Sequence, residues 1–346
     1  MQLHKALLAE GAHSTLFHVR RSPRREGTYE QIEPRAEHEG VEIHIARGRR
    51  DFRRKALAIE PKWDLMHVHT GDKLPSLDDV LGFRIALPGV PIVLTAHGTE
   101  DIRRGEDLRW TFPYAERLLA RFLVPSEHKR QVVAKISRIG NRLMAVPNLV
   151  ITPPPMDRVQ ARNELGLPLD LPVITFVALI RRSKRAHEVV ALIPKLRAMG
   201  LDPIVVIAGD GPDFPSLKAL AEPYGDRVRL LGYRTETRPI FSAANAFVYP
   251  SEIESFGLSM IEAGRYGNPV ISADIPITKN EFAGLPGYHH FPLGDVDAMA
   301  EATYAALKSH TAEEGERMKV EIEHRFGARA VAQRHLAIYE DVIRRR

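Results

Sequence analysis

The sequence predicts an α/β protein of two doubly wound domains, in which helices cover both faces of parallel sheets. Short apolar runs alternate with segments whose apolar residues have helical spacing, along almost the whole chain. The length of 346 residues fits two domains, since a domain usually has about 100–200 residues. A hydrophobic content of 44% is enough for a core in each of them.

Two series of apolar runs are interpreted as strands. The first series is 14–19, 41–46, 65–69, 91–96, 121–125 and 141–147, and the second is 173–179, 203–209, 228–232, 245–250 and 269–274. The segments between them, such as 183–200, have apolar residues at helical spacing and a glycine where a helix should stop. Each series therefore predicts one parallel sheet.

The stretch PNLVITPPPMD at 147–157 separates the two series. Each of its prolines lacks a backbone donor and fixes φ, so neither a helix nor a strand should cross it. We interpret it as an interdomain linker, which gives an N-terminal domain at 1–148 and a C-terminal domain at 149–325. The helical pattern at 326–346 has no strand after it, and packing back on the N-terminal domain is one arrangement for it.

The net charge is only +5, but the basic residues are concentrated near the N-terminus. They form two clusters, Arg20, Arg21, Arg24 and Arg25, and Arg47, Arg49, Arg50, Arg53, Arg54 and Lys55. Such clusters are typical of a solvated basic face or of a surface that meets an anionic membrane or an acidic acceptor. Nucleic acid is not expected as a partner, because no binding motif with interleaved aromatic residues accompanies the charge.

The chain has no cysteine, which excludes disulfides, thiolate metal sites and a cysteine nucleophile. This composition is typical of a cytoplasmic protein. No apolar run approaches the roughly 18–20 residues that would span a bilayer, and the N-terminus lacks the apolar region of a signal peptide. We expect a soluble or peripheral cytoplasmic protein, with membrane association left open.

The run SEIESFGLSMIEAG at 251–264 has two glutamates, Glu254 and Glu262, on either side of an apolar turn. A strand is predicted to end at Pro250 and a helix to begin near Gly257, which places the loop at the carboxyl edge of a sheet, where α/β proteins bind ligands. The first amides of a helix lack partners and attract a phosphate. Glu262 would lie ~7.5 Å along the axis, at about 1.5 Å per residue. The two acids could then hold opposite ends of one ligand, or they could be a dipole-stabilising and a surface residue.

This region closely resembles the E-x7-E region of retaining glycosyltransferases of family 4, in the run PSEIESFGLSMIEAGRYGNPVISAD at 250–274. Further segments match in register: DLMHVH (64–69), LTAHGTED (94–101), LVPSEHKRQ (123–131), PNLV (147–150), VALIRRSKR (177–185), VIAGDGPDFPSL (206–217), VRLLGY (228–233) and IYEDV (338–342). The resemblance covers nearly the whole chain. It implies the GT-B fold, which consists of two facing Rossmann-like domains.

The resemblance also implies roles for individual residues. Glu254 would hold hydroxyls of a donor sugar, Lys184 would bind the donor's diphosphate, and His97, in a TxHG motif, would face the donor sugar; these three are the expected catalytic residues. A lysine ammonium near a phosphate can neutralise the charge of a departing group. The expected donor-binding residues are Arg182, Gly211, Tyr233, Ser255, Phe256, Gly257, Leu258 and Glu262, the last of these at the ribose.

Each of these assignments has a simpler alternative. Lys184 can be a surface lysine, Tyr233 a core tyrosine and His97 a structural histidine. The GDGP run around Gly211 can be a tight turn and no more.

No catalytic metal is expected. Asp295 and Asp297 in GDVDAM are placed like metal-binding aspartates of the other large glycosyltransferase fold, but they precede a helical segment, so helix capping explains them better. His67 and His69 point the same way from one strand, yet a third ligand is not evident. We interpret these two histidines as packing residues.

The chain departs from the family pattern in two places. Ala178, Leu179 and Ile180 stand where the family has Gly-Arg-Leu, so the arginine that pairs with the lysine is missing, and Arg181 or Arg182 is the candidate substitute. The chain also opens with MQLHKALLAEGAH, which has the pattern of the helix that normally follows the first strand and a glycine-rich loop. We expect that strand and loop to be absent and the acceptor side to be weakened.

The function implied is transfer of a sugar from a nucleotide-diphosphate donor, UDP or GDP, to an acceptor hydroxyl with retention of configuration. The enzyme would be hexosyltransferase-like, need no cofactor or metal, and act on a sugar, a lipid-linked glycan or a small molecule. Two alternatives stay open. One is a nucleotide-sugar-binding module with lost or weakened catalysis, and the other is a nucleotide-sugar epimerase on the same scaffold.

Overall fold

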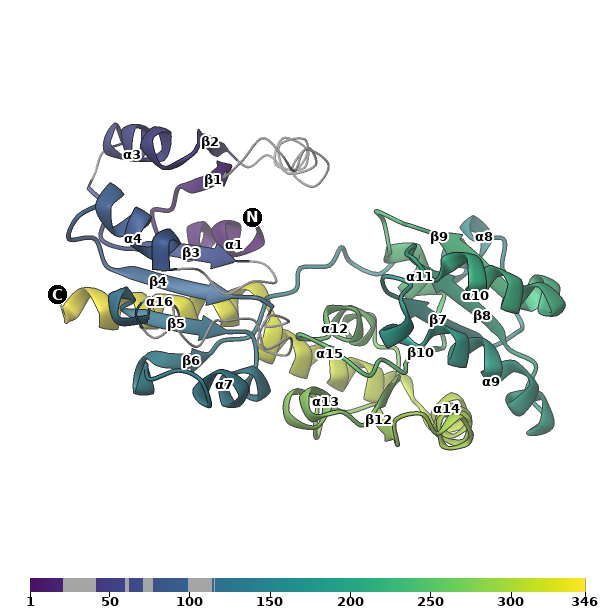
Figure 1. Cartoon of the computed structure of the whole chain (residues 1–346). Coiled ribbons are helices and arrows are strands. Elements are labelled where there is room, and N and C mark those ends of the chain that lie inside the picture. The colour runs from purple at the N-terminus through teal and green to yellow at the C-terminus, as the bar shows by residue number, and fades with distance from the viewer. Residues whose placement is uncertain (21–41, 60–61, 71–76, 99–113, 115, 346) are drawn as a thin grey trace. The chain divides into compact units, whose positions relative to one another are not determined.

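The computed structural model describes residues 1–20, 42–59, 62–70, 77–98, 114 and 116–345 (Figure 1). The chain divides into two compact units, each with its own parallel β-structure and core. Unit 1 comprises Met1–Leu149 and Ala328–Arg346, and unit 2 comprises Val150–Gly327. The last helix of the chain therefore belongs to the first unit.

Unit 1 contains two parallel sheets. The larger has the strand order β3 (Met66–Thr70), β4 (Ile92–Ala96), β5 (Arg121–Val124), β6 (Leu143–Ala145), and the smaller pairs β1 (Leu16–Arg20) with β2 (Ile43–Arg47). The helices are α1 (Gln2–Ala9), α3 (Arg49–Leu57), α4 (Leu77–Ala86), α7 (Glu127–Ala134) and α16 (Ala328–Arg344).

The alternation of side chains along β4 and β5 fixes the layers of unit 1. Ile92 and Leu94 point into a core with α4 and α7, whereas Val93 and Leu123 point to the opposite face. There they meet the buried residues of α1 and α16, which are Ala6, Leu7, Val331, Ala332, Ile338, Tyr339 and Val342. The C-terminal helix thus supplies most of one layer.

The two sheets of unit 1 are joined by side chains. Phe17 and Val19 of β1 pack in one cluster with Trp63 and with Met66 of β3. Among the described residues, no strand pairs with the free edge of β1 or with the free edge of β3. The first element is the helix α1, and residues 1–15 contain no strand.

Unit 2 is built on one six-stranded parallel sheet. Its strands are β7 (Val173–Val177), β8 (Ile204–Ala208), β9 (Val228–Gly232), β10 (Ala246–Tyr249), β11 (Val270–Ala273) and β12 (Tyr288–Phe291), in the order β12-β11-β10-β7-β8-β9. The helices are α8 (Arg158–Glu164), α9 (Ala186–Ala198), α10 (Phe214–Ala221), α11 (Arg238–Ala243), α12 (Leu258–Arg265), α13 (Pro276–Glu281), α14 (Val296–Ser309) and α15 (Ala312–Phe326). The strand β8 is buried throughout, as expected for a central strand of an α/β sheet.

All eleven predicted strands are present, with ends shifted by at most a few residues. The strand β12 was not predicted, because YHHF is short, polar and flanked by Gly287 and Pro292. The linker at 148–157 contains neither helix nor strand. The helix predicted from residue 183 begins three residues later, because Arg182–Lys184 form a 3-10 turn.

None of the helices in the described part of the chain combines the length and the apolar composition that a transmembrane span needs.

Polar contacts between α16 and β3 add to the apolar ones. The Nδ1 atom of His67 lies 2.5 Å from the Tyr339 hydroxyl, and its Nε2 atom lies 2.7 Å from the hydroxyl of Thr95. His335 is buried and donates from Nδ1 to the carbonyl of Val331 at 2.9 Å. Burial lowers the pKa of both His67 and His335, so the folded protein keeps these rings neutral.

We predict that acid destabilises unit 1. Below the ordinary histidine pKa of about 6.5, the unfolded chain takes up protons that the buried rings do not. The free energy of unfolding should then fall by up to about 1.4 kcal/mol per pH unit for each ring. Denaturant titrations at pH 7.5 and pH 5 should show a smaller pH dependence for His335→Gln than for the unmodified chain. The exposed His324 provides the control, and equal pH dependence in His335→Gln and His324→Gln would contradict the explanation.

Candidate functional site

The site of unit 2 lies where the strand order reverses. From the central β7 the chain moves to β8 and β9 on one side, and then returns to β10, β11 and β12 on the other. Ligands of open α/β sheets bind outside the carboxyl ends of the strands at such a point. The loops that leave β7 and β10 there are 178–185 and 250–257, which contain Lys184 and Glu254.

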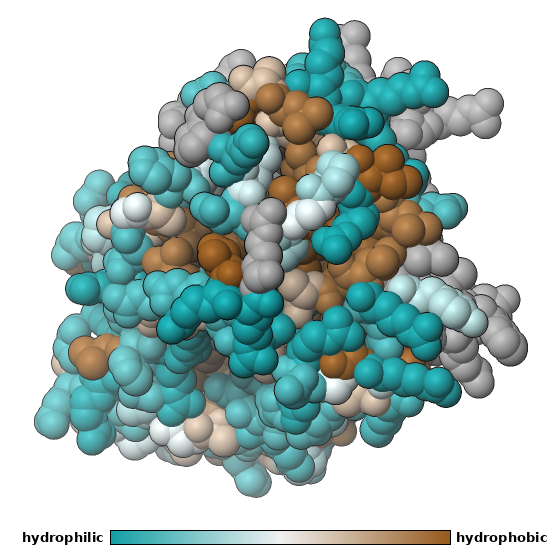
Figure 2. Space-filling model, turned by 90° about the vertical axis from the view of Figure 1, so that its left-hand side faces the viewer, coloured by the Kyte–Doolittle hydropathy of each residue, from teal (hydrophilic) through white to brown (hydrophobic). Residues whose placement is uncertain are grey.

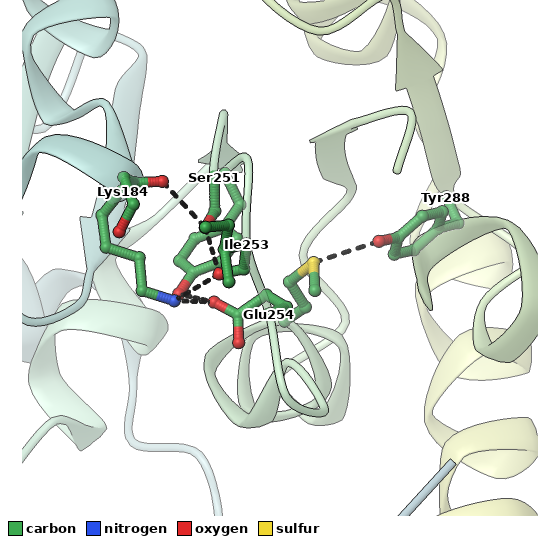
Figure 3. A network of polar contacts seen from close by, with 8 residues as sticks. Lys184, Ser251, Ile253, Glu254 and Tyr288 are labelled. Atoms are coloured by element: carbon green, nitrogen blue, oxygen red, sulfur yellow. Dashed lines mark hydrogen bonds and ion pairs between the residues drawn. The ribbon is translucent and has the colours of Figure 1, made fainter. Parts of the chain in front are cut away.

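Lys184 and Glu254 form a buried ion pair (Figure 3). Their side chains are only 9% and 10% exposed. The Nζ atom of Lys184 contacts Oε1 of Glu254 and also donates to the carbonyl of Ile253 at 3.1 Å. Lys184 is therefore not a surface lysine, and the structure brings together two of the three predicted catalytic residues.

Tyr249, the last residue of β10, is a third member of this group that the sequence analysis missed. Its hydroxyl donates to the same Oε1 atom of Glu254 at 2.6 Å, and Lys184 Nζ lies 5.5 Å from the centre of its ring. Burial, followed by the charge of Glu254, raises the pKa of Tyr249 well above its ordinary value, so the hydroxyl stays protonated and can donate. The available sequence signal was a tyrosine at the end of a strand, directly before Pro250.

Backbone contacts hold the two loops against each other. The amide of Glu252 donates to the carbonyl of Ser183 at 3.0 Å, and the hydroxyl of Ser251 donates to the same carbonyl at 3.3 Å (Figure 3). Arg185 has a left-handed backbone, with φ of 54°. Its guanidinium pairs with Glu188 and lies 3.7 Å from Glu252. These contacts keep Lys184 opposite Glu254 despite the unfavourable backbone conformation.

The helix α12 begins directly after this loop. Its N-cap is Gly257, with φ of 91°, where a Cβ atom would lie 2.3 Å from Cε of Met260. The left-handed backbone therefore favours glycine, and a larger residue would also displace the end of the Met260 side chain. No acceptor among the described residues takes the amides of Gly257 and Leu258. The start of α12 therefore offers unpaired donors and a positive dipole end beside Lys184.

The side chains of the turn before α12 differ in how far a ligand can reach them. Phe256 is 2% exposed and packs edge-on against Phe326, with ring centres 5.6 Å apart, so only its backbone can meet a ligand. Ser255 is half-buried, whereas Leu258 is 45% exposed. The predicted contacts of Phe256 are thus restricted to main-chain atoms.

Glu262 lies further along α12 and is largely buried. Burial raises its pKa to about 7. Its charge adds to that of Glu254 in raising the pKa of Tyr249. A surface role for Glu262 does not fit this burial.

The loops that follow β8 and β9 supply the other predicted positions. A Cβ atom at Gly211 would lie 2.3 Å from the carbonyl oxygen of Ile180, so this glycine lets the GDGP turn approach the loop that leads to Lys184. Tyr233 is 69% exposed after β9, which contradicts a core position for this ring.

The two candidate arginines differ in burial and in their effect on Tyr249. Arg182 is exposed, whereas Arg181 is half-buried and its charge acts on the Tyr249 hydroxyl. The placement therefore favours Arg181 over Arg182 as the second cation of the site.

His97 belongs to unit 1 and follows β4. Its Nδ1 atom lies 2.9 Å from Oδ1 of Asn148 and its Nε2 atom 3.0 Å from Nδ1 of His69. Burial lowers the pKa of His97, and the bond to Asn148 partly opposes this effect. His69 is exposed, but its ring centre lies 4.1 Å from that of His67 and 5.3 Å from that of His97, so it packs against both rings. His67 also packs against Tyr339.

Metal-ligating groups were sought throughout the described ranges. They contain no group of three or more His, Cys, Asp or Glu side chains that could hold an ion. Asp295 accepts a hydrogen bond from the amide of Ala298 at 2.9 Å, which confirms it as the cap of α14. Asp297 pairs with Lys195.

The second unit is similar to a known protein family. Residues 157–325 match the family described as Glycosyl transferases group 1. The match includes Lys184, Tyr249, Glu254 and Glu262.

Named relatives are similar over parts of the chain. N-acetyl-alpha-D-glucosaminyl L-malate synthase of Bacillus anthracis is 27% identical over 193 residues, which cover 54% of this chain and 50% of the relative. D-inositol 3-phosphate glycosyltransferase of Mycobacterium avium is 36% identical over 131 residues, or 35% of this chain and 30% of the relative. Phosphatidyl-myo-inositol mannosyltransferase of Mycolicibacterium smegmatis is 25% identical over 295 residues, or 83% and 74%. The first two similarities span half or less of those relatives.

Solved structures extend the similarity to the whole fold. A glycosyltransferase from Rickettsia africae has a TM-score of 0.76 at 13% identity, covering 100% of this chain and 94% of that one. Anabaena Alr3699/HepE in complex with UDP and glucose has a TM-score of 0.74 at 14% identity, covering 95% and 100%. The two Rossmann-like sheets of this chain form the GT-B fold, as predicted.

We predict that Lys184→Met destabilises unit 2. It leaves the Glu254 carboxylate buried without its cation, which typically costs about 3 kcal/mol. The double variant Lys184→Met/Glu254→Gln should recover most of this loss, because no buried charge remains. Denaturant unfolding of the single and double variants measures both effects.

The control for this cycle is Lys195→Met, which removes the partner of Asp297 from an exposed pair. Exposed pairs contribute about 0–1 kcal/mol. If Lys184→Met cost no more than Lys195→Met, the buried pair would not be a determinant of the fold.

Proposed function

We propose that this chain is a retaining glycosyltransferase of family 4 that uses a UDP- or GDP-sugar as donor. The observation that supports this best is the group formed by Lys184, Tyr249 and Glu254 beside the unpaired amides of α12. A cation and a helix N-terminus suit a diphosphate, and a carboxylate suits sugar hydroxyls. All residues of this group also lie within the range that matches Glycosyl transferases group 1.

Donor binding has to open the ion pair. A diphosphate at the start of α12 attracts the ammonium of Lys184 away from Glu254. The Tyr249 hydroxyl then remains as a donor to Glu254 Oε1 and keeps this carboxylate oriented towards the sugar. Glu262, buried one turn further along α12, holds the ribose.

The reaction breaks the bond between the sugar's anomeric carbon and the phosphate oxygen, and forms a bond from that carbon to the acceptor oxygen on the same face. Lys184 and the α12 amides stabilise the negative charge that grows on the nucleotide diphosphate. The acceptor's proton passes to an oxygen of the leaving phosphate, so neither glutamate has to act as the base. Transfer of a hexose, without a metal, to a sugar, lipid-linked glycan or small molecule is part of this proposal.

One structural observation keeps a second function open. The strands of unit 1 form two separate sheets among the described residues, and β1 and β3 each have an unpaired edge. A domain with this interruption would suit a module that binds a nucleotide sugar but transfers it slowly or not at all. The cytoplasmic location remains a prediction.

A screen of UDP-, GDP- and ADP-sugars for hydrolysis or transfer tests the proposal. With the active donor, Glu254→Gln should lower the rate about 10–100-fold, because a hydrogen bond to a charged group contributes about 1.5–3 kcal/mol. Calorimetry with the nucleotide diphosphate alone should show nearly unchanged affinity, since that ligand has no sugar. The exposed Glu301 gives the control Glu301→Gln.

The outcomes separate the three functions. Binding of a nucleotide sugar without turnover would favour the binding module, and conversion of the sugar without an acceptor would favour the epimerase. Absence of binding by any nucleotide diphosphate would contradict all three.

A second prediction concerns the replacement for the missing arginine. Arg181→Ala should weaken binding of the nucleotide diphosphate about tenfold, because a charge-assisted bond to phosphate contributes on the order of 1.5 kcal/mol. Arg182→Ala, whose side chain is exposed, should change the affinity little. Calorimetry on the two variants decides between them, and the reverse order of effects would place Arg182 in the site.

A further inference from the structure

The outer face of α3 combines arginines with an exposed leucine. Phe52 and Ala56 are buried on its inner face, whereas Arg50, Arg53 and Leu57 lie on the opposite face at helical spacing. Arg54 adds a further guanidinium, which is 78% exposed and pairs with Asp51 at 2.8 Å. Leu57 is 56% exposed, which is unusual for a leucine in a helix that has an apolar inner face.

The neighbouring helix α4 continues this surface. Val80 and Ala86 are buried, whereas Leu81 is 36% and Ile85 65% exposed. Arg84 lies next to Ile85 and is exposed as well. The helix thus repeats the combination found on α3.

The two outer faces point away from one common core. Phe52 and Ala56 of α3 and Phe83 of α4 pack in the same cluster, with the rings of Phe52 and Phe83 5.7 Å apart. Where the helices approach each other, a Cβ atom at Gly82 would lie 2.5 Å from Cδ of Arg49. Figure 2 views the side of the molecule where α3 and α4 lie in Figure 1, and hydrophobic side chains are visible there among hydrophilic ones.

We define the α3–α4 surface as Arg50, Arg53, Arg54, Leu57, Leu81, Arg84 and Ile85. We propose that it binds the surface of an anionic phospholipid bilayer, with the guanidinium groups at the phosphates and the three aliphatic side chains inserted between the headgroups.

The composition of this surface favours a bilayer over other anionic partners. Basic side chains next to exposed aliphatic ones are typical of helices that lie in a membrane interface. Nucleic acid would leave Leu57 and Ile85 without a function, and the surface has no aromatic side chain on which a base could stack. The basic residues Arg21, Arg24 and Arg25 lie outside the described residues and are not needed for the inference.

This inference is independent of the proposed donor chemistry, because it concerns unit 1 and a different set of residues. Its test is flotation of the full chain with vesicles of phosphatidylcholine alone and of an equimolar mixture with phosphatidylglycerol. Binding should require the anionic lipid and should weaken with salt. Arg50→Gln/Arg53→Gln should lower the partition coefficient about 25-fold, or about fivefold per arginine, because each contributes ~1 kcal/mol near an anionic leaflet.

A second variant separates insertion from charge attraction. Leu57→Gln/Ile85→Gln keeps every charge and should still lower partitioning at least about fivefold, since aliphatic side chains gain by leaving water. The control is Lys218→Gln/Leu220→Gln on α10, which removes one exposed cation and one exposed leucine from unit 2. It should bind vesicles as the unmodified chain does.

Three results would overturn the proposal. The first is equal binding to both kinds of vesicle. The second is that Leu57→Gln/Ile85→Gln binds anionic vesicles as well as the unmodified chain does. The third is that the unmodified chain binds a short DNA duplex and that Arg50→Gln/Arg53→Gln weakens this binding as much as it weakens binding to vesicles. Because all substituted residues are exposed, circular dichroism should show that the variants fold.

Discussion

The pairing of β10 with β7 is the constraint on which the site of unit 2 depends. Only two residue pairs define its register, Ala246 with Ile174 and Phe247 with Thr175. Because the strands are parallel, their carboxyl ends lie at the same edge, and the loops that follow must meet there. A lysine and a glutamate that are 70 positions apart in the chain thereby become direct neighbours. The chemistry of the site is a consequence of the strand order.

Burial then determines how these groups behave. An ion pair at low exposure is strong only while both partners are present, and Tyr249 supplies a neutral donor that does not alter the charge. When a ligand attracts Lys184, the ammonium group exchanges the Glu254 carboxylate for an anionic group of the ligand. Glu254 still accepts the hydrogen bond from Tyr249, so the buried carboxylate keeps a donor. Arg185 and the bond between Glu252 and Ser183 limit how far the loops can separate during this exchange. The arrangement combines a fixed backbone with one replaceable side-chain contact.

The sequence contains much of this information, but not all of it. Apolar periodicity predicts the strands because buried parallel strands need continuous apolar runs, and it fails at β12, which lies at the edge of the sheet and is only partly buried. The E-x7-E motif identifies Glu254 and Glu262, since their spacing is local. Tyr249 and the choice between Arg181 and Arg182 depend on where side chains meet across the sheet, which spacing does not encode. The sequence analysis expected the first strand of the N-terminal domain to be absent. Among the described residues of unit 1, β1 and β2 form one sheet and β3 to β6 form another, with no strand between β1 and β3.

The position of α16 has a consequence for how the chain folds during synthesis. Val93 and Leu123 are covered in part by α1, but most of the buried residues that face them belong to α16, which leaves the ribosome after all of unit 2. The segment synthesised first must therefore wait with much of one side of its sheet open to water, while unit 2 is already complete. Domains usually fold in the order in which they are made. In this protein we expect the order of completion to be inverted, and the unfinished first half to depend on chaperones until the last residues emerge.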